Sequence, residues 1–261
     1  MIDRETLTGG GVNEVIRIGT TVRRPTGPWS PLVHNLLRHL RARGFTAAPS
    51  LHEVTADGFE ILDFIPGEVC NYPLSRAAAS AAALESAAAL LRDYHDHTVE
   101  YAAGASTEGW LLPVRIPAEV ICHGDYAPYN CVLDGDNVVG IIDFDTAHPG
   151  PRVWDIAYAL YRWAPMTAPP NRDGFGTAEE QAARARTFCD HYGLDAAGRA
   201  TLVDTVIARL HALVDFMRSQ AASGNTAFAG HLADGHHILY LTDAEYIQQQ
   251  RNVFERHLLA N

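Results

Sequence analysis

The sequence contains no lysine, and all 20 of its basic residues are arginine. The four cysteines show no C-x-x-C spacing, so neither a zinc site nor a disulfide framework is indicated, and we expect reduced thiols. No apolar run approaches the length needed to span a membrane, and the N-terminal residues 1–5 lack the basic and apolar regions of a signal peptide. We therefore expect a cytoplasmic protein.

Positive charge is scarce as well. The formal net charge of −11 argues against nucleic acid or anionic lipid as a partner, because both require basic surfaces. The charge is compatible with a cationic substrate, but an acidic balance also keeps a protein soluble, so it names no substrate. With 261 residues, 47% of them hydrophobic, the chain can bury a core as one compact unit or two closely joined lobes.

The most informative segment is residues 123–130, His-Gly-Asp-Tyr-Ala-Pro-Tyr-Asn, which is followed by Ile-Ile-Asp-Phe at residues 141–144. The carboxylate of Asp125 can accept a hydroxyl proton, while Asn130 and Asp143 can hold Mg²⁺ on the phosphates of a nucleotide. These residue types, in this order and spacing, are typical of phosphoryl transfer.

The residues between the two strings predict a β-hairpin. Residues 131–133 alternate into an Asp-Gly-Asp-Asn turn at 134–137, and residues 138–142 return. This hairpin would bring Asn130 and Asp143 together in space. A surface hairpin with incidental acidic residues is the alternative.

The block resembles the catalytic core of the aminoglycoside phosphotransferase and choline kinase-like enzymes, which are relatives of the protein kinases. The resemblance implies that Asp125 is the catalytic base and that Asn130 and Asp143 are metal ligands. It also implies that His123 and a later aspartate, Asp155, support the catalytic loop. The fold that it implies is α+β, two-lobed and protein-kinase-like, with a small β-rich lobe at residues 1–66 and a larger helical lobe at residues 67–261.

Near the N-terminus, Gly9, Gly10 and Gly11 enter an alternating run at residues 15–18. Glycines let backbone amides approach phosphate closely, which suits a hairpin that covers a nucleotide. A plain hairpin turn is the alternative, and the resemblance favours the nucleotide-covering role. Further along, the resemblance implies that the backbone of Phe64 and Ile65, just before Pro66, forms the hinge that binds the base of the nucleotide.

The missing lysine raises a mechanistic question, because the kinase-like fold normally pairs a lysine of the small lobe with the α- and β-phosphates. Arg23 or Arg24 occupies the position of this lysine in the sequence, and comparison with the family favours Arg23, which follows Val22. Strand alternation does not decide, since the two side chains point to opposite faces. A guanidinium can fork onto two phosphate oxygens, whereas two solvated edge-strand arginines are the alternative.

The partner of that lysine, a glutamate on the next helix, is also missing. Ser30, Pro31 and Gly44 mark the ends of this helix, which contains no acidic residue and has His34 or Asn35 near the position of the glutamate. We therefore expect the phosphates to be held by an arginine without an acidic anchor, or by the glycine turn and metal alone.

The rest of the chain reads as helical. An alanine-rich helix is predicted at residues 75–94, and helices are predicted from Ala178 to the C-terminus. The Pro- and Gly-rich segment 167–176 is either a lid that faces the substrate or a mobile connection.

We accordingly expect transfer of a γ-phosphoryl group from ATP or GTP, with Mg²⁺, to a hydroxyl of a small molecule. The acceptors that the resemblance implies are aminoglycoside-like antibiotics and hydroxylated metabolites. A nucleotide-binding pseudokinase and a protein that sequesters an antibiotic or metabolite without turnover are the alternatives. The retained Asp125, Asn130 and Asp143 speak against both. The identity of the acceptor and the choice between ATP and GTP stay open.

Overall fold

The computed structural model describes residues 4–7 and 15–260. The predicted turn at Gly9, Gly10 and Gly11 lies outside these residues. The chain divides into two compact units, one made of residues 1–71 and 90–152 and the other of residues 72–89 and 153–261. The first unit thus contains both the sheet expected for residues 1–66 and the catalytic hairpin. The lobe boundary at Pro66 stays a prediction.

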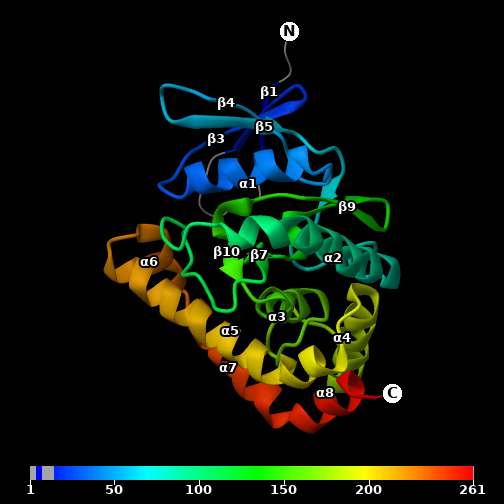
Figure 1. The fold of residues 1–261 in the computed structure, drawn as a ribbon. Coiled ribbons are helices and arrows are strands. Elements are labelled where there is room, and N and C mark those ends of the chain that lie inside the picture. The colour runs from blue at the N-terminus through cyan, green and yellow to red at the C-terminus, as the bar shows by residue number, and fades with distance from the viewer. Residues whose placement is uncertain (1–3, 8–14, 261) are drawn as a thin grey trace. The chain divides into compact units, whose positions relative to one another are not determined.

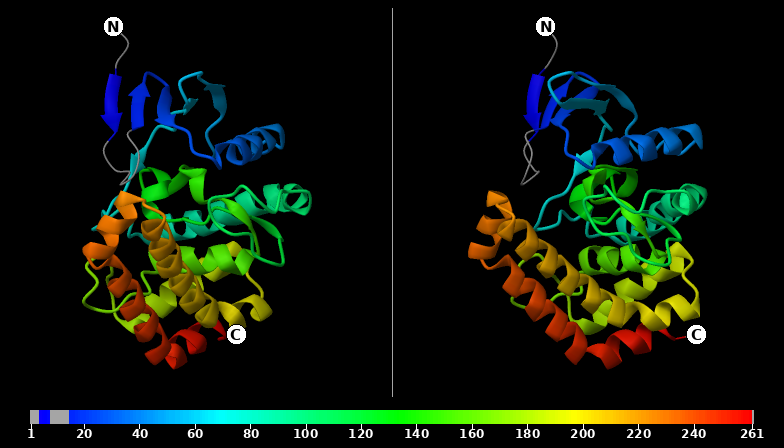
Figure 2. Two further views of the ribbon diagram at one scale, coloured as in Figure 1. Left: turned by 90° about the vertical axis from the view of Figure 1, so that its left-hand side faces the viewer. Right: turned by 60° about the vertical axis from the view of Figure 1, so that its left-hand side comes forward.

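The first unit contains a five-stranded antiparallel sheet with the strand order β1-β2-β3-β5-β4. Figure 2 shows β1, β2 and β3 running alternately in opposite directions. Tight turns at Gly19 and Gly58 connect successive strands of the sheet. The strands are β1 (Arg4–Leu7), β2 (Val15–Ile18), β3 (Thr21–Pro25), β4 (Leu51–Val54) and β5 (Phe59–Asp63).

One helix, α1 (Ser30–Ala42), lies beside this sheet (Figure 1). Pro31 occupies its first turn and Gly44 follows its end with a positive φ of 86°, as the sequence predicts. The apolar face of the helix is buried through Val33, Leu36 and Leu40. It also buries the polar side chain of His34.

The catalytic segment forms the predicted hairpin, in which β8 (Cys131–Asp134) pairs with β9 (Asn137–Ile141). The short strand β6 (Glu68–Val69) pairs with β8 and so adds a third strand to this sheet. A 3₁₀ turn (Pro128–Asn130) directly precedes β8 in the chain. A second small sheet pairs β7 (Val120–Cys122) with β10 (His148–Gly150), which fixes both ends of the catalytic segment.

The alanine-rich helix α2 spans Ala81–Ala103 and therefore begins and ends later than the predicted range of 75–94. It begins after Ser80, because the Ser80 hydroxyl accepts a hydrogen bond from the Ala83 amide at 3.1 Å and so caps the helix. It continues past Tyr94 because no helix-breaking residue follows until Gly104.

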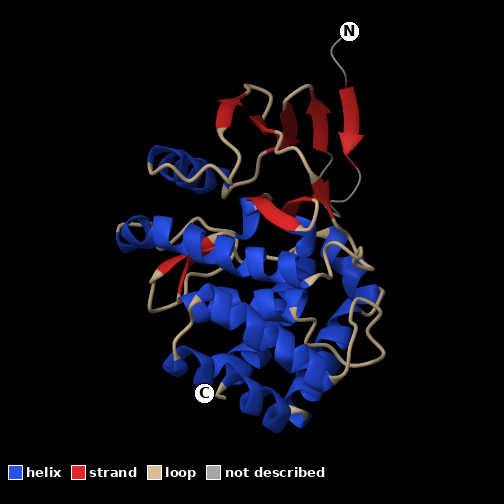
Figure 3. Ribbon diagram, turned by 90° about the vertical axis from the view of Figure 1, so that its right-hand side faces the viewer, coloured by secondary structure: helices blue, strands red, loops and turns tan. Residues whose placement is uncertain are grey.

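The second unit is built of helices and loops (Figure 3), and every described strand belongs to the first unit. Figure 2 shows α5 and α7 side by side, with α6 joining them at one end. The predicted helical C-terminal region is confirmed. Its helices are α3 (Arg152–Trp163), α4 (Ala178–Tyr192), α5 (Ala196–Ala222), α6 (Thr226–Ala233), α7 (His236–Gln249) and α8 (Arg251–Leu258).

In the second unit, α3 is buried from Trp154 to Trp163, including the charged side chains of Asp155 and Arg162. Among the residues that the structure describes, no helix is long and apolar enough to cross a lipid bilayer.

The segment between α3 and α4 is anchored over its first half. Asp243 of α7 accepts hydrogen bonds from the Ala168 amide at 2.8 Å and from the Asn171 side chain at 2.7 Å. The Gln181 side chain donates to the Thr167 carbonyl at 3.1 Å. Residues 166–168 are thus packed and hydrogen-bonded, which argues against a mobile connection at that end. The lid function of the segment stays a prediction.

Candidate active site

The centre of the site is Asp125, whose carboxylate is held by two neighbours in the same loop. Tyr129 donates its hydroxyl to Oδ1 at 2.7 Å, and Asn130 donates its side-chain amide to Oδ2 at 2.9 Å. The same amide also donates to the Asp125 carbonyl at 2.9 Å. The carboxylate is therefore fixed in one orientation. An ionised carboxylate accepts up to about four hydrogen bonds, two on each oxygen, and it can also accept a proton.

The buried ring of His123 makes hydrogen bonds to the backbone of this loop and of the segment before Asp143. Its ring is fully buried, its Nε2 lies 2.9 Å from the Ile142 carbonyl, and its Nδ1 accepts the Asp125 amide at 3.3 Å. These two partners assign the ring proton to Nε2, since a carbonyl can only accept and an amide can only donate. His123 thus connects the loop that carries Asp125 to the segment that carries Asp143.

Gly124 allows these two segments to approach each other. Its φ of 81° favours glycine, and a Cβ atom at this position would lie 2.4 Å from the Thr146 carbonyl oxygen. On the other side, the Thr146 hydroxyl donates to the His123 carbonyl at 2.9 Å. Any side chain at residue 124 would push the loop away from the segment after Asp143.

Asp143 follows the predicted hairpin directly, and the Ile142 amide donates to the Asn130 carbonyl at 2.9 Å. The backbone of Asp143 adopts the left-handed conformation, with φ 63° and ψ 67°, which aspartate tolerates better than most residues. Its side chain is 46% exposed, so one carboxylate is presented at the surface of the site. The structure therefore brings Asn130 next to the segment that carries Asp143.

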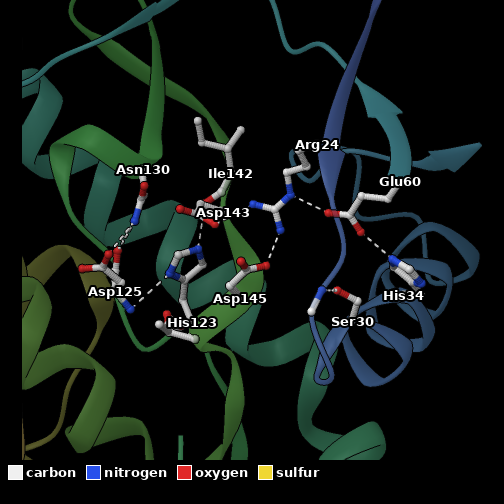
Figure 4. A network of polar contacts seen from close by, with 12 residues as sticks. Arg24, Ser30, His34, Glu60, His123, Asp125, Asn130, Ile142, Asp143 and Asp145 are labelled. Atoms are coloured by element: carbon white, nitrogen blue, oxygen red, sulfur yellow. Dashed lines mark hydrogen bonds and ion pairs between the residues drawn. The ribbon is translucent and has the colours of Figure 1, made fainter. Parts of the chain in front are cut away.

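Arg24 is the cation of the site, and Figure 4 shows it between Glu60 on one side and Asp143 and Asp145 on the other. Its Nη1 donates to Asp143 at 2.8 Å, its Nη2 to Asp145 and its Nε to Glu60. Burial lowers the pKa of Arg24, but the three carboxylates outweigh it and leave the pKa above its ordinary value. Arg24 stays charged at every physiological pH.

This arrangement corrects the preference for Arg23. Arg23 donates to the exposed Asp57 at 2.6 Å, and its guanidinium lies 3.5 Å from the centre of the Phe59 ring. Neighbouring residues of a strand point to opposite faces, so only one of the two arginines can reach Asp143. The register of β3 against β5 makes it Arg24, which pairs directly with Glu60.

The expectation that the arginine lacks an acidic anchor is also wrong. Glu60, which is 1% exposed, accepts Arg24 on one oxygen and His34 of α1 on the other. Glu60 and Asp145 were not predicted as site residues, and His34 was noted only as a neighbour of the missing glutamate. Only Asp145 gives a sequence signal, an acid two residues after Asp143. The role of Glu60 depends on strand register, which the sequence does not give.

The remaining predicted residues lie as follows. Asp155 stands in the first turn of α3 and is fully buried; its support of the catalytic loop stays a prediction. The Phe64 amide donates to the Thr20 carbonyl at 2.9 Å, directly after β5. Ile65 packs on Gly140, where a Cβ would come within 2.9 Å of its side chain. A hinge that binds the base through Phe64 and Ile65 stays a prediction.

The donor set fits Mg²⁺ bound together with a nucleotide. Among the described residues no group of three or more His, Cys, Asp or Glu side chains forms a metal site. Mg²⁺ is commonly held by one or two protein oxygens, phosphate oxygens and water, so Asp143 and Asn130 suffice. The amide nitrogen of Asn130 is bonded to Asp125, which leaves its oxygen to ligate a cation. Asp143 already holds a cationic group, the guanidinium of Arg24.

The chain is similar in sequence to known proteins. Residues 102–200 match the model of the phosphotransferase enzyme family. A trifolitoxin immunity protein of Rhizobium leguminosarum bv. trifolii is 34% identical over 215 residues, which cover 79% of this chain and 80% of that protein. The chain belongs to the phosphotransferase enzyme family.

Solved structures share the fold of this phosphotransferase family member at low sequence identity. A choline/ethanolamine kinase family protein from Mesorhizobium loti has a TM-score of 0.65 and 16% identity, and the match covers 98% of this chain and 91% of that one. An aminoglycoside phosphotransferase in a ternary complex with streptomycin and ATP has a TM-score of 0.58 and 14% identity, with coverage of 94% and 93%. The predicted family and the two-lobed, protein-kinase-like α+β fold are confirmed.

Proposed function

We propose that this protein transfers the γ-phosphoryl group of ATP or GTP to a hydroxyl group of a small molecule. The observation that carries the proposal is the clamped carboxylate of Asp125, held by Tyr129 and Asn130 in a loop that is bonded to the Asp143 segment. A base for an acceptor hydroxyl and a ligand for a metal–nucleotide complex are the two parts that this reaction requires.

In the proposed reaction, the acceptor hydroxyl donates its proton to a carboxylate oxygen of Asp125. The hydroxyl oxygen forms a bond to the γ-phosphorus, the bond from that phosphorus to the β–γ bridging oxygen breaks, and the nucleoside diphosphate leaves. Clamping by Tyr129 and Asn130 limits rotation of the carboxylate, so little orientational freedom is lost when the acceptor binds.

The phosphates of the nucleotide would be held by the other half of the site. Asn130 and Asp143 would ligate Mg²⁺, which neutralises charge on the β- and γ-phosphates when it is bound. Arg24 would present its two Nη groups to phosphate oxygens, a fork geometry that a lysine ammonium does not offer. The turn at Gly9, Gly10 and Gly11 and the hinge at Phe64 and Ile65 complete the proposed nucleotide site.

For the acceptor we propose an aminoglycoside-like antibiotic or another hydroxylated metabolite. Structures with the same fold include an aminoglycoside phosphotransferase bound to streptomycin, and the relative with 34% identity is named for immunity to trifolitoxin. The net charge of −11 is compatible with a cationic acceptor. A toxin or antibiotic is therefore the acceptor class to test first, and a nucleotide-dependent reaction fits a cytoplasmic location.

The test is a two-stage screen. Thermal shifts with Mg·ATP and Mg·GTP identify the nucleotide, and release of nucleoside diphosphate is then measured with a library of hydroxylated antibiotics and metabolites. Acceptor-dependent release that disappears in Asp125→Asn and persists in Asp136→Asn, an exposed change in the same hairpin, would support the proposal. Tight acceptor binding without release for any nucleotide would contradict it.

A second candidate is sequestration of a toxin without chemistry, because an immunity function, as in the relative's name, can rest on binding alone. The two functions separate in cells that express Asp125→Asn. Sequestration predicts that this variant protects cells from the toxin as well as the wild-type protein does, whereas phosphoryl transfer predicts that protection is lost.

A further inference from the structure

The side chains of Arg24, Glu60 and His34 form a continuous polar chain from the candidate nucleotide site to α1 (Figure 4). Glu60 divides its carboxylate between two partners: Oε1 accepts from Arg24 Nε and Oε2 contacts His34 Nε2. Because a carboxylate only accepts, His34 must carry its proton on Nε2. All three side chains are at most 10% exposed, so water screens these contacts little.

The sheet itself fixes the first of these contacts. Arg24 of β3 and Glu60 of β5 are directly opposite each other in the antiparallel register, where side chains lie on the same face with their Cβ atoms close together. The backbone pairing of two adjacent strands therefore places the carboxylate beside the cation.

The nitrogens of the Arg24 guanidinium have partners on two different sides. Glu60 takes Nε, on the inner side, and both Nη groups extend toward Asp143 and Asp145. Nη1 and Nη2 can therefore exchange carboxylate oxygens for phosphate oxygens while Nε stays bonded to Glu60. Asp143, once released from Arg24, would be available to a cation.

We propose that Glu60 and His34 are positioning residues, which hold Arg24 with its two Nη groups directed at the α- and β-phosphates of the nucleotide. This inference rests on the proposed function and deepens it. The usual pair in the fold is a strand lysine with a helix glutamate. Here the carboxylate has moved to the strand next to the cation, and the helix contributes His34 as a second donor to that carboxylate.

The choice of residue types is consistent with this assignment. A buried carboxylate is costly unless hydrogen bonds satisfy its oxygens, and Glu60 receives one donor on each oxygen. Removing His34 would leave Oε2 without its donor and would let Glu60 rotate. The position of α1 is thereby linked to the direction of the Arg24 guanidinium.

The first test needs no nucleotide. In protein labelled with ¹⁵N-arginine, the Nε–H signal of Arg24 is assigned by its loss in Arg24→Lys. The proposal expects this proton to be protected from exchange with solvent and displaced downfield by Glu60, and it expects the signal to shift in His34→Gln although His34 does not touch Arg24. An exposed, rapidly exchanging Arg24 Nε–H would overturn the clamp.

The second test measures affinity for Mg·ADP and Mg·ATP by calorimetry without an acceptor. Glu60→Gln and His34→Gln are each expected to weaken binding, Glu60→Gln by about tenfold. In an Arg24→Met background the same changes should alter affinity by less than about twofold, since residues that act through one another are not additive. Matched controls are Glu53→Gln and His52→Gln, two exposed changes on β4, which should leave affinity unchanged.

The outcomes separate the two levels of the argument. If the wild-type protein binds no Mg·nucleotide, the proposed function fails, and the phosphate-positioning role fails with it. If the wild-type protein binds but Glu60→Gln and His34→Gln bind equally well, the positioning role alone is overturned. Losses that are the same with and without Arg24 would overturn it too, because they would mark a merely structural effect. Circular dichroism of each variant checks that it is folded.

Discussion

Asn130 donates its side-chain amide to both the carbonyl and the carboxylate of Asp125, each at 2.9 Å. The side-chain nitrogen of Asn130 therefore orients the proposed base, and its side-chain oxygen is the metal ligand that we propose. The six residues from Asp125 to Asn130 form a loop that these hydrogen bonds close, and such preorganisation is what phosphoryl transfer requires.

Replacement of the proposed base should separate chemistry from binding. Asp125→Asn keeps the shape of the side chain but loses the ability to accept a proton, so we expect turnover to fall by about 10²- to 10⁴-fold while nucleotide affinity stays nearly unchanged. Steady-state kinetics together with calorimetry measure both quantities, and Asp136→Asn in the exposed turn is the control. Turnover within tenfold of the wild-type value would rule out Asp125 as the base.

The metal ligand should affect binding as well as turnover. Asp143→Asn removes the charged oxygen that we assign to Mg²⁺, so nucleotide affinity measured with Mg²⁺ should fall toward the value measured in EDTA. The affinity of the wild-type protein for free nucleotide, without Mg²⁺, provides the reference. An unchanged Mg²⁺ dependence in the variant would show that the ion is held elsewhere.

The two neighbouring arginines provide a matched pair. Arg24→Met removes a buried cation that contacts three carboxylates, so we expect a higher nucleotide KM, a lower turnover and a loss of stability. Arg23→Met removes only the contacts with Asp57 and the Phe59 ring, and it should behave as a surface change. Steady-state kinetics of both variants measure the nucleotide KM and turnover, and thermal unfolding measures their stability. Equal effects of the two changes would contradict the assignment of Arg24.

Asp155 should matter for stability as well as activity. Its side chain is fully buried, so Asp155→Ala should cost about 1–3 kcal/mol of unfolding free energy by leaving buried donors unpaired, and it should lower turnover through the catalytic loop. Urea unfolding measures the cost, with Asp215→Ala on the exposed side of α5 as the control. A change of less than about 0.5 kcal/mol, the range of ordinary surface changes, would contradict this role.

Asp243 should make stability depend on pH. Burial raises the pKa of Asp243 above its ordinary value of 3.8, although Ala168, Tyr161 and Asn171 donate hydrogen bonds to it. A raised pKa means that the folded state binds the proton more tightly, so this contribution to stability is complete below the unfolded value and is lost as the pH rises through the folded one.

The test for Asp243 compares the wild-type protein with Asp243→Asn, which does not titrate. The difference in unfolding free energy, wild type minus variant, should decrease as the pH rises from about 3.8 through the folded pKa of Asp243 and then stay level. Urea unfolding at a series of pH values measures it. A difference that grows with pH over this window would reverse the sign of the shift.

Much of this protein could be predicted from local sequence. The order and spacing of His123, Asp125, Asn130 and Asp143 predict the catalytic loop and its hairpin. A β-hairpin forms between residues that are close in sequence, so its turn and its register follow from the local residue types. The helix α1 follows in the same way from Pro31, its apolar spacing and Gly44. These features depend on contacts between residues that are close in sequence.

Only the tertiary structure decided which of the two arginines lies in the candidate site and which residues contact it. Arg23 and Arg24 are equivalent in the sequence, and the pairing register of β3 with β5 is what turns Arg24 toward Glu60 and Asp143. Glu60 lies 36 residues after Arg24 and Asp143 lies 119 residues after it. Strand register and helix packing are set by the burial of whole faces, so no local pattern could reveal that Arg24 contacts a glutamate on the neighbouring strand, which in turn contacts a histidine on α1.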